Sequence, residues 1–163
     1  MDAIKLLEED HKLVKRLLKE HEELPHGQPE RKRAHAERII RELMVHERIE
    51  EEIFYPAYKR AADEEGRELV AEAKEEHHVV DLIIEELQSV ELDAEDFDAK
   101  FTVLKENVEH HIKEEEEEMF PDAKKLLKDK LETLGDAMLQ YKEELTAQIE
   151  APASRKEDAK RAR

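Results

Sequence analysis

Apolar residues recur every three or four positions through most of the chain, which is the spacing expected of helices that bury one face. This periodicity predicts five helices, over roughly residues 2–24, 30–62, 67–90, 94–120 and 129–150. Four long helices with short connections favour an up-down-up-down four-helix bundle, with the fifth as an additional C-terminal helix. The expected fold class is therefore all-α, with one domain over residues 1–150.

Proline and acidic residues set the expected helix ends. The segment Pro25–Pro29 is the clearest break, because its second proline suits the first turn of the following helix. Asp93 is placed to cap the fourth helix. Asp129 and Glu132 have the spacing of a capping box, which predicts that the fifth helix starts at Asp129.

Other breaks fall inside or after the helical stretches. Pro56 is expected to kink or open the second helix, and Pro121 to interrupt the fourth. The segment 63–66 is expected to be a turn because it ends in glycine. Residues 151–163, with five basic and two acidic residues, are expected to form a disordered basic tail.

One histidine lies within the apolar stripe of each of the four long helices. His11 and His77 are 66 residues apart, and His46 and His111 are 65 residues apart. The chain therefore reads as two helical hairpins of similar plan. Packing two such hairpins into a bundle brings side chains of facing helices together in the core, where bundles commonly build metal sites.

A longer motif occurs twice. The segments His46–Pro56 and His111–Pro121 both read His, three residues, Glu, four residues, aromatic, Pro. A histidine and a glutamate four residues apart share one helix face. Burying the two glutamates in an aliphatic core costs several kcal/mol unless they are paired or metal-bound, and no Lys or Arg on the inner stripes is placed to pair them. The residues that we interpret as metal ligands are His11, His46, Glu50, His77, His111 and Glu115.

The apolar stripes also decide between neighbouring histidines. His111 shares its face with apolar residues and precedes its proline by ten positions, as His46 does, whereas His110 does not. By the same test His77 faces inward and His78 outward. The histidines expected at the surface are His21, His26, His35, His78 and His110.

Several other polar residues lie near the motifs. Glu47 and Asp81, the latter assigned to the inner stripe of the third helix, are candidates for extra ligands or for partners of the ligands. The run Glu114–Glu118 offers an alternative metal site, although its members outside the stripe fit a solvated face better. Tyr55 and Tyr58 are candidates for contact with the metal, and core packing is their other role.

Composition excludes several classes of function. The net charge of −17 argues against nucleic acid as a partner, because phosphate recognition requires clustered Lys and Arg. The lack of cysteine excludes disulfides, thiol catalysis and thiolate metal sites. No apolar run approaches the ~20 residues needed to span a bilayer, and the first residues are too charged for a signal peptide. We therefore expect a cytoplasmic protein with neither nucleic-acid nor membrane partners.

With these motifs the sequence resembles the hemerythrin-like, or HHE cation-binding, family. The residues that match its ligand pattern are His11, His46 with Glu50, His77, and His111 with Glu115. The resemblance covers roughly residues 2–150 and includes the aromatic residue and proline of each motif. It implies a four-helix bundle with two non-heme iron ions and an oxo or hydroxo bridge. In this arrangement the histidines are terminal ligands and the glutamates bridge. Imidazole and carboxylate ligands also suit iron and other first-row metals.

The sequence departs from the oxygen-carrying members that this resemblance brings in. The oxygen-carrying hemerythrins have a fifth histidine at the position where this chain has Asp81. They also have an aspartate five residues after the fourth-helix histidine, whereas this chain offers Glu115 at a spacing of four. Six protein ligands leave more coordination positions open than the carriers have. The resemblance therefore implies a reactive centre rather than simple reversible oxygen carriage.

The leading hypothesis is a di-iron protein that reacts with a small oxidant, namely hydrogen peroxide, nitric oxide or O2. Its enzymatic form is a catalase-like or NO-reactive oxidoreductase. The alternatives are a reversible O2-binding or iron/O2-sensing protein without turnover, and a structural bundle without metal. Ferritin-like oxidases fit less well, because their Glu-x-x-His spacing is missing from the inward positions.

Overall fold

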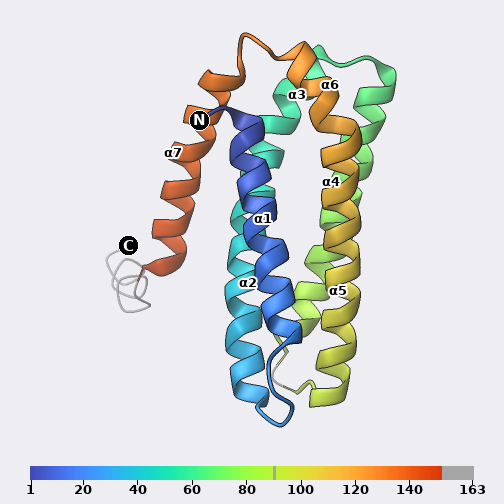
Figure 1. Cartoon of the computed structure of the whole chain (residues 1–163), viewed down its shortest axis with the longest axis vertical. Coiled ribbons are helices and arrows are strands. Elements are labelled where there is room, and N and C mark those ends of the chain that lie inside the picture. Colours follow the sequence, from blue (N-terminus) through green and yellow to red (C-terminus); the bar gives the residue numbers. More distant parts are fainter. Residues whose placement is uncertain (90, 152–163) are drawn as a thin grey trace, which may run out of the picture.

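Four long helices run alternately down and up and form a bundle (Figure 1). They are α1 (Ala3–Glu22), α2 (Pro29–Ile49), α4 (Glu64–Leu87) and α5 (Ala94–Glu114). The computed structural model describes residues 1–89 and 91–151, and this part of the chain contains no strand. The expected all-α, up-down-up-down bundle is confirmed. No helix in the described ranges is long and apolar enough to cross a membrane.

A polar layer divides the bundle core into two apolar clusters. One cluster includes Leu7, Val70 and Met119, and the other includes Val14 and Val80. The layer between them holds buried imidazoles and carboxylates: His11, His46, Glu50, His77, His111 and Glu115. Because apolar side chains close both sides of this layer, its polar atoms must find partners among themselves or in a bound ion.

Both motif prolines are accommodated by a π-helical turn just before them. The chain continues from α2 through η1 (Glu50–Phe54) into α3 (Tyr55–Ala61), and from α5 through η2 (Glu115–Met119) into α6 (Phe120–Leu126). Proline lacks an N–H and clashes with the carbonyl four residues back. A π turn widens the helix at this point, and each proline then lies in the first turn of the resumed α-helix. The helix therefore opens locally, as predicted at the first proline, but neither proline ends it.

Aspartate side chains cap three of the long helices. Asp2, Asp63 and Asp93 accept hydrogen bonds from backbone N–H groups three residues on, at 2.9, 3.0 and 2.8 Å. The segment 63–66 is therefore not the predicted turn, because Asp63 caps α4 and Gly66 already lies inside it. A side chain at Gly66 would place its Cβ 2.8 Å from the hydroxyl oxygen of Tyr58. Glycine here permits close packing of that tyrosine.

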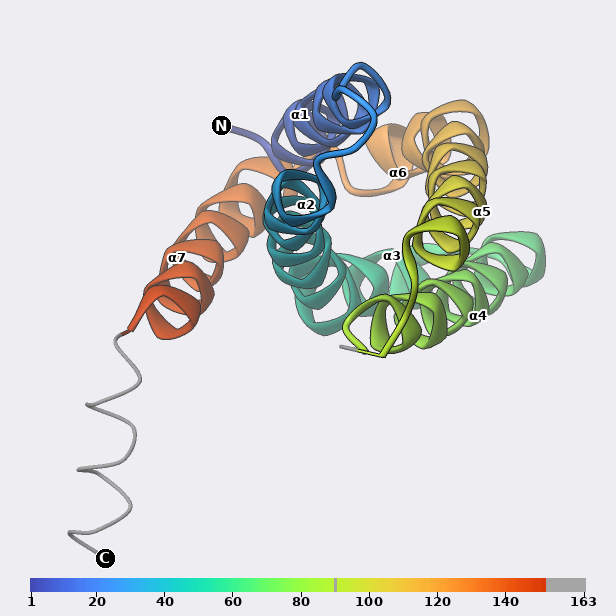
Figure 2. The same ribbon diagram turned by 90° about the horizontal axis from the view of Figure 1, so that it is seen from below.

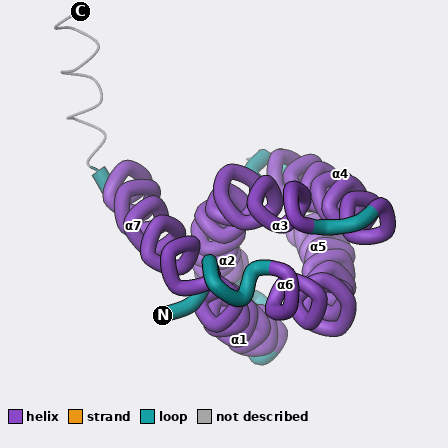
Figure 3. The backbone as a smooth tube through the Cα atoms, turned by 90° about the horizontal axis from the view of Figure 1, so that it is seen from above, coloured by secondary structure: helices purple, strands orange, loops and turns teal. Residues whose placement is uncertain are grey.

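The last helix, α7 (Leu131–Glu150), packs outside the bundle against α1 and α2 (Figure 2). The predicted capping box is wrong, because the turn after α6 continues to Lys130 and α7 begins without a side-chain cap. Figure 3 shows the bundle from the end opposite to that in Figure 2, where α3 and α6 lie next to each other. Of the predicted tail, only Ala151 falls within the described residues.

Candidate metal centre

The six predicted ligands meet in the polar layer as two adjoining groups. His11, His46, Glu50 and Glu115 form the first ligand group, and Glu50, His77 and His111 form the second. The atoms of each group lie within 4.8 Å of one another, and all six residues are buried. The structure therefore brings together residues from α1, α2, η1, α4, α5 and η2.

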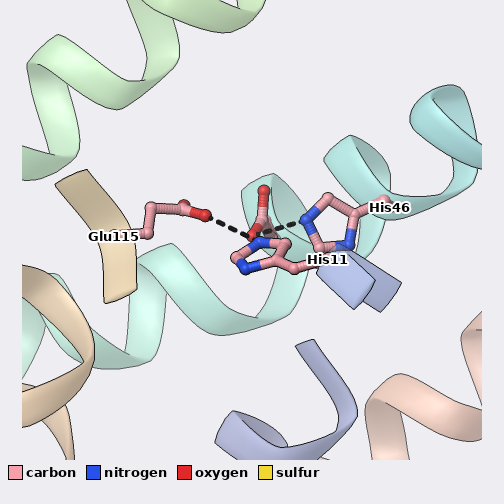
Figure 4. A group of neighbouring side chains, drawn as sticks. His11, His46 and Glu115 are labelled. Carbon is pink, nitrogen blue, oxygen red and sulfur yellow. Dashed lines mark ion pairs between the residues drawn. The ribbon is translucent and has the colours of Figure 1, made fainter. Parts of the chain in front are cut away.

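Two imidazole–carboxylate contacts define the first ligand group. The Nε2 atom of His11 lies 3.2 Å from Oε2 of Glu115. The Nε2 atom of His46 lies 3.0 Å from Oε1 of Glu50. Figure 4 shows Glu115 and His11 pointing toward each other, with His46 beside them. Nitrogen and oxygen donors from four different segments thus converge on one small volume.

The other oxygen of each glutamate lies near a histidine of the second ligand group. Oε2 of Glu50 lies 3.2 Å from Nε2 of His77, and Oε1 of Glu115 lies 3.4 Å from Nε2 of His111. The two imidazole Nε2 atoms are 3.1 Å apart. Glu50 therefore offers one oxygen to each group, and Glu115 has one oxygen in the first group and the other beside His111 of the second. This is the arrangement needed for a carboxylate that bridges two ions.

Orphaned polar atoms show that these residues fit a bound metal. Among the described residues, six buried side-chain atoms make no hydrogen bond. Two of them, Nδ1 of His21 and of His35, lie away from the centre, and the other four are Nε2 of His11 and of His46, Oε1 of Glu50 and Oε2 of Glu115. Buried polar atoms without partners are rare in folded proteins. All four belong to the first ligand group, and mixed imidazole and carboxylate donors suit first-row transition metals.

A second set of carboxylates holds the outer nitrogen of each histidine. Each Nδ1 atom lies 2.9 to 3.2 Å from a carboxylate oxygen. Such partners fix the ring orientation and leave Nε2 free for metal. The pairs are His11–Glu116, His46–Asp10, His77–Glu51 and His111–Glu76.

Sequence reasoning missed these four acidic residues, although the repeat contains a signal for them. Glu51 and Glu116 directly follow Glu50 and Glu115, and Asp10 and Glu76 directly precede His11 and His77. The same acidic residue type thus recurs at the same place in both hairpins. Only the three-dimensional pairing shows which histidine each one contacts.

The hydroxyl of Tyr55 contacts the second ligand group, so this side chain does more than fill the core. Its hydroxyl donates to Oε1 of Glu115 and lies 3.2 Å from Oε2 of Glu50 and 3.3 Å from Nε2 of His77. Burial, followed by the two glutamate charges, raises its pKa well above the ordinary value, so the hydroxyl keeps its proton. The widened turn places Tyr55, five residues after Glu50, back over that glutamate.

The corresponding residue of the second hairpin is Phe120, which has no hydroxyl. Its ring stacks on His11 with the centroids 5.5 Å apart. The two ligand groups are therefore chemically different, although the helices that build them are related by the repeat. Tyr58, the other candidate, lies elsewhere and donates to Asp122 at 2.7 Å.

The two additional candidates, Glu47 and Asp81, lie in neither ligand group. Glu47 is buried, and its burial together with the nearby Asp81 charge raises its pKa to about 8 against the opposing charge of His77. The inward placement of Asp81 is wrong, because this side chain is exposed. Four residues advance a helix by about 400°, so Asp81 is offset by about 40° from His77. At Asp81, unlike at Glu50 and Glu115, the side chain ends in solvent.

Among the other histidines, His26, His78 and His110 are exposed, as predicted, and His35 is half-buried. The prediction for His21 is wrong. Its ring is buried against Phe101, with the centroids 3.7 Å apart, and burial lowers its pKa to about 4. In the acidic run, Glu117 and Glu118 form the expected solvated face.

The carboxylates govern protonation of the metal-free histidines. Burial by itself lowers the pKa of His46, but the charge of Glu50 and the charge and hydrogen bond of Asp10 outweigh it and raise the pKa to about 10. In the same way, Glu50 and Glu51 outweigh burial and raise the pKa of His77 to about 9. Both rings are therefore protonated at neutral pH when no metal is bound.

Metal loading at neutral pH is consequently expected to release protons, because a ligating imidazole must be neutral. Calorimetry of Zn²⁺ binding in buffers of different ionisation enthalpy measures the release.

In the metal-free protein the raised histidine pKa values stabilise the fold fully below about pH 6.5, and this contribution is lost as the pH rises through about 9 to 10. The melting temperature of the metal-free protein should therefore fall over this pH interval. A melting temperature that rises instead would contradict the raised pKa values of His46 and His77.

The fold and its ligands define a class: four-helix-bundle proteins with a buried His/Glu cluster able to hold metal. The model of the hemerythrin HHE cation-binding domain matches residues 2–123, so this chain belongs to that family. The match leaves out α7.

Two relatives agree with this assignment. A crystal structure of a hemerythrin HHE cation-binding domain-containing protein from Mycobacterium kansasii superposes with a TM-score of 0.74 at 28% identity. The match covers 89% of this chain and 87% of that one. An uncharacterised hemerythrin-like protein of Schizosaccharomyces pombe is 30% identical over 89 residues, which are 55% of this chain and 44% of that protein. The chain thus matches less than half the length of this curated relative.

Proposed function

We propose that this protein is a cytoplasmic, non-heme di-iron protein that reacts with a small oxidant: hydrogen peroxide, nitric oxide or O2. The observation that carries the proposal is the position of Glu50 and Glu115 between the two ligand groups. Each glutamate has one oxygen near a histidine of the first group and the other near a histidine of the second. Two iron ions held there would supply electrons to the oxidant or take them from it. The histidines and glutamates of the chain hold the ions, and the surrounding carboxylates orient the rings.

The cavity beside the ligands supports a small substrate. Its volume is about 20 Å³, and all four ligand histidines border it. A single water needs roughly 10–15 Å³ of such space, so the cavity suits a molecule of about two heavy atoms. Its apolar wall, which limits entry of water and ions, consists of Val14, Leu43, Val80, Val108 and Ile112. A larger cavity of about 330 Å³, which Pro29 and Phe97 help to line, has none of the six ligands in its wall.

Reaction with oxidants is tested on protein loaded with iron. Stopped-flow absorption with hydrogen peroxide and with NO should show rapid changes in the iron-dependent spectrum, and an oxygen electrode should detect O2 release if peroxide is disproportionated to water and O2. Protein loaded with redox-inactive Zn²⁺ is the matched control. If two irons are bound and neither oxidant changes the spectrum or is consumed, the reactive function is wrong. Repeated oxygenation and deoxygenation without net oxidation would instead support reversible O2 binding.

Replacement of Tyr55 by Phe is expected to weaken metal binding at the second ligand group by about 10- to 100-fold, the usual effect of losing a partner of a ligand. The first ligand group should be weakened less, because Tyr55 contacts neither of its histidines and neither of the glutamate oxygens that face them. Co²⁺ titrations followed by absorption resolve the two steps. Tyr58→Phe is the matched control, since it also removes a hydroxyl bonded to a carboxylate. Equal weakening by both substitutions would show that Tyr55 acts through packing alone.

A further inference from the structure

In both hairpins, a carboxylate lies beside Nδ1 of the histidine on the second helix, which is His46 in the first hairpin and His111 in the second. In the first hairpin, one oxygen of Asp10 lies 3.2 Å from Nδ1 of His46. In the second, one oxygen of Glu76 lies 3.1 Å from Nδ1 of His111. Asp10 and Glu76 are related by the same 66-residue offset as His11 and His77. Each carboxylate therefore has one oxygen on a ligand histidine and a second oxygen directed elsewhere.

The second oxygen of Asp10 contacts a cation supplied by the chain. It accepts from the ammonium group of Lys142, which α7 carries to the outside of α1 and α2. On this side α2 presents Val45 and Ile49, which are buried. The first hairpin thus has a covered surface and a fixed positive charge beside the carboxylate that orients His46.

The second hairpin has the same carboxylate but a different surface. At the positions that correspond to Val45 and Ile49, 65 residues later in the chain, the second hairpin has His110 and Glu114. α7 lies on the far side of the bundle, and no other described helix covers α4 and α5 here (Figure 2). The second oxygen of Glu76 therefore faces exposed polar side chains, with no counterpart of Lys142 among the described residues.

Those side chains converge as metal ligands do. Nε2 of His110 lies 3.0 Å from Oε1 of Glu114 and 3.6 Å from Oε2 of Glu76. Ligand atoms from all three residues lie within 4.8 Å of one another. The side chains of Glu76, Glu114 and His110 are 20%, 29% and 63% exposed, so hydrated ions can reach them from solvent.

We propose that Glu76, His110 and Glu114 form a surface site for a divalent first-row cation, which takes the place that Lys142 occupies in the first hairpin. One imidazole and two carboxylates form a donor set suited to Zn²⁺, Mn²⁺ or Fe²⁺, with water completing the coordination. Glu76 links this site to the buried centre, because its other oxygen holds His111. Occupation of the surface site polarises Glu76 and thereby changes the environment of one buried ligand.

The link to His111 rests on the proposed metal function of the buried centre, whereas cation binding at the surface does not. Equilibrium dialysis of metal-free protein against Zn²⁺, followed by elemental analysis, should find three ions per chain. His110→Ala and Glu114→Gln should each lose one ion and retain two. His78→Ala, which removes another exposed histidine that lies in α4, should still bind three. If only the surface site is real, wild type should bind one ion and His110→Ala none.

The coupling is measured on protein whose buried centre is first loaded with iron. Added Zn²⁺ should shift the iron absorption bands of wild type and of His78→Ala, but not those of His110→Ala. His110→Lys, which supplies a permanent ammonium as Lys142 does, should abolish Zn²⁺ uptake at the surface. A wild-type stoichiometry of two, or a third ion that persists in both His110→Ala and Glu114→Gln, overturns the proposal.

Discussion

Replacement of Glu115 by Gln is expected to lower metal affinity by more than about 100-fold, because losing even an indirect partner of a ligand costs 10- to 100-fold. One oxygen of this carboxylate lies in the first ligand group and the other faces His111 of the second, so the substitution removes a negative charge from beside both groups. It also removes a contact that raises the pKa of His11 and of His111. Zn²⁺ calorimetry and the metal content after dialysis measure the effect.

Glu118→Gln is the matched control for this substitution. Glu118 lies in the same acidic run, three residues after Glu115, but its side chain is exposed. It should bind metal with wild-type affinity and stoichiometry. Retention of two tightly held ions by Glu115→Gln would show that this glutamate does not bridge the two ligand groups.

Metal loading is expected to raise the melting temperature by about 8–16 °C. A ligand that binds only the folded chain stabilises it by about 4 kcal/mol at 1,000 times its dissociation constant, and each kcal/mol shifts the midpoint of a 150- to 250-residue domain by about 2–4 °C. The physical source is the polar layer, where buried imidazoles and carboxylates lack sufficient partners when no cation is present. Differential scanning calorimetry of loaded and chelated protein measures the shift.

The double variant Glu50→Gln/Glu115→Gln should show little shift on adding metal, because both carboxylates that lie between the two ligand groups are gone. This variant separates stabilisation at the centre from general effects of salt or of surface binding. An unchanged melting temperature of wild-type protein on chelation, together with no stoichiometric metal, would support the plain structural bundle.

Much of the fold follows from periodic patterns along the chain. The apolar stripes predicted the four long helices, because each stripe must be buried against another helix, and the short connections predicted their antiparallel order. The predicted start of α7 was wrong, since Asp129 and Glu132 have capping-box spacing but the turn extends to Lys130. Such local signals are weak where tertiary packing decides which residue first enters a helix.

The sequence by itself determined the six candidate ligands, because a helix has a fixed period and each ligand lies on an apolar stripe that must face inward. It also chose His111 over His110, and the structure places the first inside and the second outside. These results need no knowledge of how the helices are rotated or spaced.

Only the tertiary structure decided how those ligands are supported. The π turns changed the register by one residue and brought Tyr55 over Glu50, which a regular α-helical period would not do. The pairing of each histidine with a carboxylate from a neighbouring helix, and of Asp10 with Lys142, depends on contacts between segments far apart in sequence. The repeat makes the two halves of the centre similar, and packing of α7 against one half alone makes their surroundings different.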